Sequence, residues 1–204
     1  MTIEQLILKR HKQENEWHKP QLGVYHASGL YDIIHGTVKP ENFFKQQALD
    51  EKTIHTFWIG TMYHEAIQRL VIRIGENPTD KHQAVDIEKR VQLIIPRDPV
   101  VASENELIII IVGSVDLIHN QHVLELKTCS TLPAKPDPGH KLQTQLYMKA
   151  TGLPGVITYI LKHPTQVVTR NFKVEPMTEN EWQEVCASLT EFDSKLRKLN
   201  PSMP

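Results

Sequence analysis

The part of the chain that decides the fold reads Gly113-Ser114-Val115-Asp116-Leu117-Ile118-His119-Asn120-Gln121-His122-Val123-Leu124-Glu125-Leu126-Lys127. Two stretches in and around it, residues 107–118 and 123–127, are rich in Ile, Val and Leu, which is typical of β-strands. Charged side chains are rare in such buried strands unless something pairs with them. Three of them nevertheless stand here: Asp116, Glu125 and Lys127.

The turn between the two stretches determines which residues face each other. If Asn120 and Gln121 form a two-residue hairpin turn, the ladder places Asp116 directly opposite Glu125, roughly 4.5–5.5 Å away. Asn-Gln is a poorer turn sequence than Asn-Gly, so the turn is the weakest step of this prediction. Side chains alternate along a strand, and Glu125 and Lys127 therefore point the same way. The sequence predicts that two carboxylates and one ammonium converge.

Two opposed carboxylates repel each other, and burial adds a desolvation cost. A divalent cation would relieve both effects, and carboxylate oxygens suit magnesium or manganese. An alternative is a buried ion pair between Glu125 and Lys127, with Asp116 at a strand end. That alternative leaves the convergence of three charges unexplained, so we expect a site for Mg²⁺ or Mn²⁺.

An amphipathic helix is predicted upstream of this hairpin. Apolar residues recur at helical spacing over residues 59–74. His64 and Gln68 are four residues apart within it and share one face. A single histidine on a helix is more often structural than a metal ligand, so His64 becomes a candidate ligand only together with the hairpin.

A second helix is predicted downstream, over residues 139–151, where Gly152 and Pro154 end it. Gln143 and Tyr147 are again four residues apart and share a face. Tyr147 can also serve as a half-buried aromatic side chain that anchors this helix to the sheet, and the two roles are compatible.

These motifs together resemble the PD-(D/E)XK nuclease superfamily, and within it the RecB-like branch, which is related to the CRISPR-adaptation nucleases. The resemblance covers residues 25–173. Gly113-Ser-Val-Asp116 followed by Glu125-Leu-Lys127 resembles the core motif of the superfamily. Gly60-Thr-Met-Tyr-His64 resembles the Gly-x-x-x-His helix of the branch, and Gln143-Thr-Gln-Leu-Tyr147 its Gln-x-x-x-Tyr signature.

The resemblance implies a restriction-endonuclease-like α/β fold, in which helices flank a central mixed sheet of about five strands. The predicted order of helix, three strands, helix and strand agrees with it. We expect one domain over residues 1–204: a helical N-terminal extension over 1–50, a nuclease core over 51–175 and a C-terminal helix over 176–204 packed on the core. That last helix begins with the capping box Thr178-x-x-Glu181.

The resemblance also assigns roles to the site residues. The implied metal ligands are His64, Asp116, Glu125 and the backbone carbonyl of Leu126, and the implied catalytic residues are Asp116, Glu125 and Lys127. Gln143, Tyr147 and Lys141 would contact DNA, although Lys141 also fits a solvated surface. Glu88, in the predicted strand 85–95, takes the place of an acidic residue of many members, but a solvent-facing role fits it equally well.

The implied activity is metal-dependent hydrolysis of DNA, most simply by an exonuclease that acts on DNA ends or single strands in repair, recombination or phage replication. An endonuclease of the same fold is the nearest alternative, and a nuclease-like subunit without catalysis is another. A metalloenzyme that does not act on nucleic acids uses similar carboxylates but would not need the Gln143–Tyr147 helix. A helicase or recombination protein is a possible partner.

Cysteine content and charge limit these possibilities. Many CRISPR-adaptation nucleases bind an iron–sulfur cluster through four cysteines, whereas this chain has only Cys129 and Cys186, so we expect no cluster. Two cysteines suggest a reducing compartment, the bacterial or host cytoplasm. A net charge of −1 argues for a groove that binds a few nucleotides. No stretch is apolar enough for a membrane span or a signal peptide.

Overall fold

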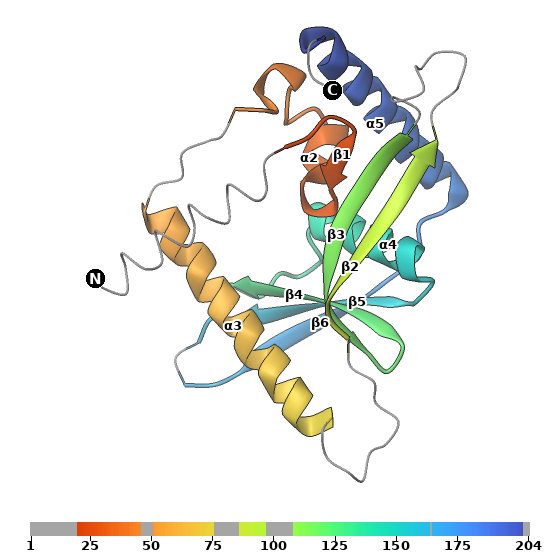
Figure 1. Cartoon of the computed structure of the whole chain (residues 1–204). Helices are drawn as coiled ribbons and strands as arrows, with labels where there is room; N and C mark the ends of the chain where they lie inside the picture. Colours follow the sequence, from red (N-terminus) through yellow and green to blue (C-terminus); the bar gives the residue numbers. More distant parts are fainter. Residues whose placement is uncertain (1–19, 46–50, 76–85, 97–107, 164, 202–204) are drawn as a thin grey trace.

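The computed structural model describes residues 20–45, 51–75, 86–96, 108–163 and 165–201, and it has an α/β fold with helices around a mixed sheet (Figure 1). The strands are β1 (Val24–His26), β2 (Asp86–Pro96), β3 (Ile108–His119), β4 (His122–Cys129), β5 (Gly155–Leu161) and β6 (Val168–Val174). The helices are α2 (Leu30–Ile34), α3 (Glu51–Gly75), α4 (Pro138–Thr151) and α5 (Glu179–Leu199), with short 3₁₀ helices η1 (Ala27–Gly29) and η2 (Pro40–Asn42). The predicted fold class is confirmed.

The central strand is β3, which has three neighbours. It pairs with β2 along one edge, antiparallel. Along its other edge it pairs with β1, parallel, over residues 110–112, and with β4, antiparallel, over residues 117–119. Residues 113–116 therefore have no strand partner on that edge among the described residues. This four-residue gap is Gly113-Ser-Val-Asp116, the first part of the predicted motif.

The hairpin between β3 and β4 forms through the predicted turn. Asn120 and Gln121 have φ angles of +49° and +58°, as a two-residue type I′ turn requires. The ladder then runs through three residue pairs and ends at Leu117 and Leu124. The register is the predicted one, but the ladder ends one step before Asp116 and Glu125, so these two residues are not a paired position. Along its other edge, β4 pairs in parallel with β5 from Val123 to Cys129.

Helices cover the two faces of the sheet in different ways. Helices α2, α4 and α5 pack on one face, where the largest apolar cluster includes Tyr25, Ile109, Leu146, Leu189 and Leu196. Helix α3 stands apart from them, beside β4 (Figure 1). The Cα of Gly60 on α3 approaches Thr128 of β4 so closely that an added Cβ would lie 3.1 Å from its hydroxyl.

The segment predicted as a helical extension, residues 1–50, is partly core. Residues 24–26 form β1, and Tyr25 and Leu30 are buried. A strand of three residues is too short to show an alternating pattern, which is why sequence reasoning missed it. Residues 1–19 and 46–50 of the predicted extension lie outside the described residues.

The C-terminal helix α5 has the predicted capping box, in which Thr178 and Glu181 exchange hydrogen bonds. Its apolar face packs on the core from Val185 to Leu196, with Leu189 and Leu196 fully covered, whereas Leu199 at its end is exposed. The amphipathic pattern predicted for α3 is only partly confirmed, since Ile59 and Met62 are exposed. Within the described part of the chain, no helix has the length and apolar character that crossing a membrane requires.

Candidate active site

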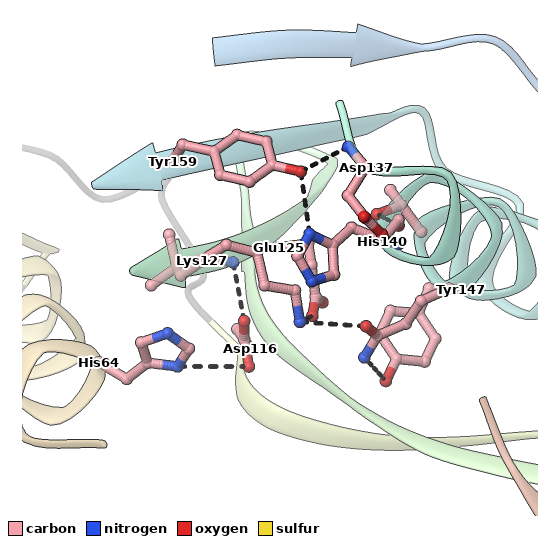
Figure 2. A network of polar contacts seen from close by, with 11 residues as sticks. His64, Asp116, Glu125, Lys127, Asp137, His140, Tyr147 and Tyr159 are labelled. Atoms are coloured by element: carbon pink, nitrogen blue, oxygen red, sulfur yellow. Dashed lines mark hydrogen bonds and ion pairs between the residues drawn. The ribbon is translucent and has the colours of Figure 1, made fainter. Parts of the chain in front are cut away.

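The carboxylate of Asp116 lies at the opening between β3 and β4 (Figure 2). Its Oδ2 accepts a hydrogen bond of 2.8 Å from the backbone N–H of Leu126. The side chain thus connects β3 to β4 just beyond the last backbone pair of their ladder. Two residues of α3 approach it from the other side. His64 Nδ1 is 3.9 Å from Asp116 Oδ1, and Gln68 Nε2 donates to the Asp116 backbone carbonyl at 3.2 Å.

Glu125 and Lys127 form an ion pair on β4, as their alternation predicts. Lys127 Nζ is 2.7 Å from Glu125 Oε1. The Glu125 side chain is only 1% exposed, and that of Lys127 is 20% exposed. The second oxygen, Glu125 Oε2, is buried and has no hydrogen-bond partner among the described residues. Buried polar atoms are almost always paired, so this lone carboxylate oxygen is the atom of the cluster that a ligand could contact.

Gln143 and Tyr147 extend from α4 toward this ion pair and connect it to the gap in β3. Lys127 Nζ donates to Gln143 Oε1 at 3.0 Å, and Gln143 Nε2 donates to the Tyr147 hydroxyl at 2.9 Å. The backbone N–H of Ser114 also donates to that hydroxyl. We call this chain of hydrogen bonds, from Lys127 through Gln143 to Tyr147, the relay. It fixes the amide of Gln143 in one orientation, with its carbonyl toward Lys127.

Both relay side chains are buried, Gln143 to 7% exposure and Tyr147 to 3%. This differs from the expected DNA contact, because a buried hydroxyl that already has two donors has little surface to offer a nucleotide. The structure gives Tyr147 the anchoring role that we kept as an alternative, and it makes Gln143 and Tyr147 positioning residues for Lys127. Lys141 is exposed, and its charge acts on Glu181 of α5, away from the site.

Gly113 makes room for Tyr147. A Cβ at this position would lie 2.5 Å from Tyr147 Cε1 and 2.9 Å from its hydroxyl oxygen. No real Cβ comes that close to another heavy atom, so any side chain here would displace the tyrosine. The glycine of the Gly113-Ser-Val-Asp116 motif therefore has a steric role, which links the motif on β3 to the motif on α4.

The electrostatics of the cluster favour a cation. Burial, and next the charge of Asp116, raises the pKa of Glu125 to about 8, and Lys127 offsets only part of this rise. Burial also raises the pKa of Asp116 above its ordinary value, despite the opposing effects of His64 and the Leu126 N–H. Burial lowers the pKa of His64, which keeps the imidazole neutral at pH 7, the form that binds metals.

The donor atoms suit magnesium or manganese, which prefer oxygen ligands. Glu125 offers its lone Oε2, and Asp116 and His64 lie beside it. As the side chains stand, no three His, Cys, Asp or Glu residues within the described ranges are arranged as a complete metal site. One carboxylate oxygen of each acid is already engaged, which keeps it from a metal ion. Glu125 Oε1 is paired with Lys127, and Asp116 Oδ2 accepts a hydrogen bond from the Leu126 N–H.

Glu88 is brought to the same place. It lies on β2 between residues that pair with Leu117 and Val115, and so stands across from Asp116. Its φ of +49° is unusual for a non-glycine residue and costs on the order of 1–3 kcal/mol. Its charge acts on both Asp116 and His64. The side chain is exposed, as the solvent-facing alternative expected, and its role in the site stays a prediction.

Sequence reasoning missed a second polar group beside the site. His140 Nδ1 on α4 lies 2.9 Å from the Tyr159 hydroxyl, which also accepts from the Asp137 N–H at 2.9 Å (Figure 2). Burial, with the charge of Lys127, lowers the pKa of His140. The sequence signal for this group was the pair Asp137-Pro138, which is typical of the start of a helix. Asp137 caps α4, and the helix therefore begins at Pro138, one residue earlier than predicted.

Comparison with known proteins supports the fold. The sequence matches no protein-family model and no curated protein. Among solved structures, the crystal structure of SSO0001 is similar, with a TM-score of 0.63 over 97% of this chain and 88% of that chain. The two sequences are 15% identical, so the likeness concerns the fold alone.

Proposed function

We propose that this chain is a metal-dependent deoxyribonuclease that hydrolyses phosphodiester bonds. The observation that carries the proposal is the lone, buried Oε2 of Glu125, which lies in a cluster with Asp116 and has Lys127 beside it. Two carboxylates and a lysine around a vacant oxygen suit metal-assisted hydrolysis better than a purely structural ion pair, which would leave no carboxylate oxygen unpaired. The resemblance of the motifs to RecB-like nucleases points to the same chemistry.

In this proposal Asp116, Glu125, His64 and the carbonyl of Leu126 hold one or two Mg²⁺ or Mn²⁺ ions. The bound ion supplies Lewis acidity, which polarises the phosphate and lowers the pKa of an attacking water. Lys127 orients that water or accepts its proton, and its ammonium stabilises the negative charge that builds on the phosphorane. Gln143 aims the Lys127 ammonium, because the two are hydrogen-bonded.

The resemblance suggests a DNA end or a single strand as the substrate, and thus an exonuclease, with an endonuclease as the nearest alternative. A role in repair, recombination or phage replication, a place in the cytoplasm and a helicase partner belong to the same proposal. Every motif position of the chain is filled, which argues against a subunit that has lost catalysis.

The proposal is tested by incubating end-labelled single- and double-stranded DNA with the protein and Mn²⁺ or Mg²⁺. We expect metal-dependent cleavage by the wild type and a loss of at least about a hundredfold in Lys127→Ala, since the general acid–base contribution of a positioned side chain is of that size. Lys173→Ala is the matched control, because Lys173 is exposed on β6 and far from the cluster in the strand order.

Closed circular DNA distinguishes the two modes of cleavage. An exonuclease leaves it intact and degrades linear DNA, whereas an endonuclease cuts both. If the wild type binds Mn²⁺, measured by titration calorimetry, but cleaves no nucleic acid, the proposed activity is wrong.

A further inference from the structure

The exposed surface of the sheet is hollowed next to the candidate active site. The hollow has a volume of about 550 Å³. It is lined by residues of three adjacent strands: His26 of β1, Arg90, Val91 and Gln92 of β2, and Val112, Gly113 and Ser114 of β3. It therefore begins at the gap in β3, where β1 has ended and β4 has not yet begun.

The register of the sheet connects this hollow to Asp116. Arg90 stands directly opposite Ser114 in the antiparallel ladder, so both side chains lie on one face. Ser114 and Asp116 are two residues apart on β3 and share that face, about 7 Å apart along the strand. This spacing is close to the separation of successive phosphates along a nucleic-acid strand. A chain whose scissile phosphate lies at Asp116 would place its neighbouring phosphate beside Arg90.

Arg90 is suited to hold that phosphate. It is exposed, and it forms no ion pair or hydrogen bond with any residue in the described part of the chain. Its planar guanidinium presents a fork of donors that matches a phosphate. The exposed hydroxyl of Ser114 across the ladder adds another donor. The carboxylates of Asp116 and Glu88 lie nearby, so an anion needs a cation such as Arg90 to approach this surface.

Ser114 also connects the hollow to the catalytic lysine. Its backbone N–H donates to the Tyr147 hydroxyl, and Tyr147 and Gln143 carry the relay to Lys127. A phosphate held at Ser114 would thus rest on the same backbone unit that positions Lys127.

We propose that the hollow is a phosphate-binding subsite for the substrate strand, in which Arg90 and Ser114 hold the phosphate adjacent to the one that is cleaved. The subsite rests on the proposed nuclease function. It adds a path for the nucleic-acid strand, which would run from Asp116 along β3 on the side where β2 lies. It adds a local cationic contact beside the site in a chain whose net charge is −1.

The subsite is tested by binding, apart from cleavage. The affinity of a fluorescent single-stranded oligonucleotide is measured by anisotropy over a range of salt concentrations, with EDTA to prevent cleavage. For single strands the logarithm of affinity falls with the logarithm of salt by about 0.7 for each phosphate contact. We expect Arg90→Gln to bind about tenfold more weakly and to reduce this slope by about 0.7.

Two variants control the experiment. Lys173→Gln removes an exposed charge from β6, at the far edge of the sheet, and is expected to leave affinity and slope unchanged. Arg90→Lys keeps the charge without the fork and is expected to keep the slope while lowering the affinity. Because Arg90 is exposed, both of its variants are expected to melt at the wild-type temperature.

Each outcome decides one question. If Arg90→Gln and the wild type share one slope and one affinity, or if the wild type binds no DNA, the subsite is overturned. If Arg90→Gln shows the lower slope but the wild type cleaves no DNA with Mn²⁺, the subsite stands as a nucleic-acid contact and the nuclease activity fails.

Discussion

At the scale of a single residue, Glu125 has the most unusual environment in the candidate site. Its carboxylate is buried, one oxygen faces Lys127 and the other has no partner within the described residues. Burial and the charge of Asp116 raise its pKa to about 8, although the Lys127 ammonium beside it favours the ionised form. A bound divalent cation requires the ionised form, and metal binding at neutral pH would therefore release a proton.

The raised pKa of Glu125 makes stability depend on pH in the metal-free protein. Between about 4.5, its ordinary value, and about 8, the folded state binds a proton that the unfolded state has lost. The contribution of this group is thus complete below pH 4.5 and is lost as the pH rises to 8. Glu125→Gln cannot ionise, so we expect its free energy of unfolding to fall less than that of the wild type over this range.

The measurement is urea denaturation at several pH values with EDTA, and the quantity of interest is the difference between the two proteins. Addition of Mn²⁺ at pH 8 is expected to restore stability to the wild type and much less to Glu125→Gln. Parallel pH profiles for the two proteins would contradict a raised Glu125 pKa.

Alternation along one strand was enough to predict that Glu125 and Lys127 meet, because that rule depends only on the local backbone. The contact of Asp116 depends on where the ladder ends, and this was not predictable from the hairpin alone. On its other edge β4 pairs with β5 from Val123 onward, and the position of β5 depends on α4 and on residues more than 25 positions away. Asp116 consequently meets the Leu126 N–H instead of facing Glu125.

At the scale of elements, the gap in β3 between β1 and β4 brings the motifs together. The side chain of Tyr147 on α4 reaches this gap, with its ring over Gly113 and its hydroxyl at the Ser114 N–H. Sequence spacing placed Gln143 and Tyr147 on one face of α4, which the structure confirms. This face is buried because it contacts Gly113, which lies 34 positions earlier in the sequence. A local sequence pattern cannot predict such a contact.

Gly113→Ala tests this arrangement. The new Cβ would lie 2.5 Å from Tyr147 Cε1, so the ring must move and the relay through Gln143 to Lys127 must loosen. We expect a loss of about 1–3 kcal/mol in the free energy of unfolding, the usual cost of overpacking, and a lower rate of DNA cleavage at saturating substrate.

Gly29→Ala is the matched control, since a Cβ at Gly29 would meet nothing within 4 Å. Its stability and cleavage rate are expected to stay close to those of the wild type. If Gly113→Ala behaves like Gly29→Ala in both measurements, the glycine is not needed for the position of Tyr147.

At the scale of the whole molecule, the last helix is tied to the first strand. Asp193 of α5 is fully buried and accepts hydrogen bonds from the Gly23 N–H at 3.1 Å and the Tyr25 hydroxyl at 2.6 Å. Arg197 Nε, one turn later, donates to its other oxygen at 2.8 Å. The packing of α5 was predicted from its apolar stripe, but this polar tie was not, because Asp193 stands in sequence like any charged residue on a helix.

Asp193→Ala is therefore expected to destabilise the whole fold. The change removes the acceptor shared by the partly buried Arg197, the Tyr25 hydroxyl and the Gly23 N–H, and each buried donor left unsatisfied typically costs about 1–3 kcal/mol. Glu191→Ala, on the same helix, removes an exposed ion pair with Lys195 and is expected to change stability little. Urea denaturation of the two variants measures the difference, and equal midpoints would show that the tie between α5 and β1 does not stabilise the fold. Because β1 borders the gap in β3 that holds the candidate site, Asp193→Ala is also expected to weaken DNA cleavage at temperatures where the wild type stays folded.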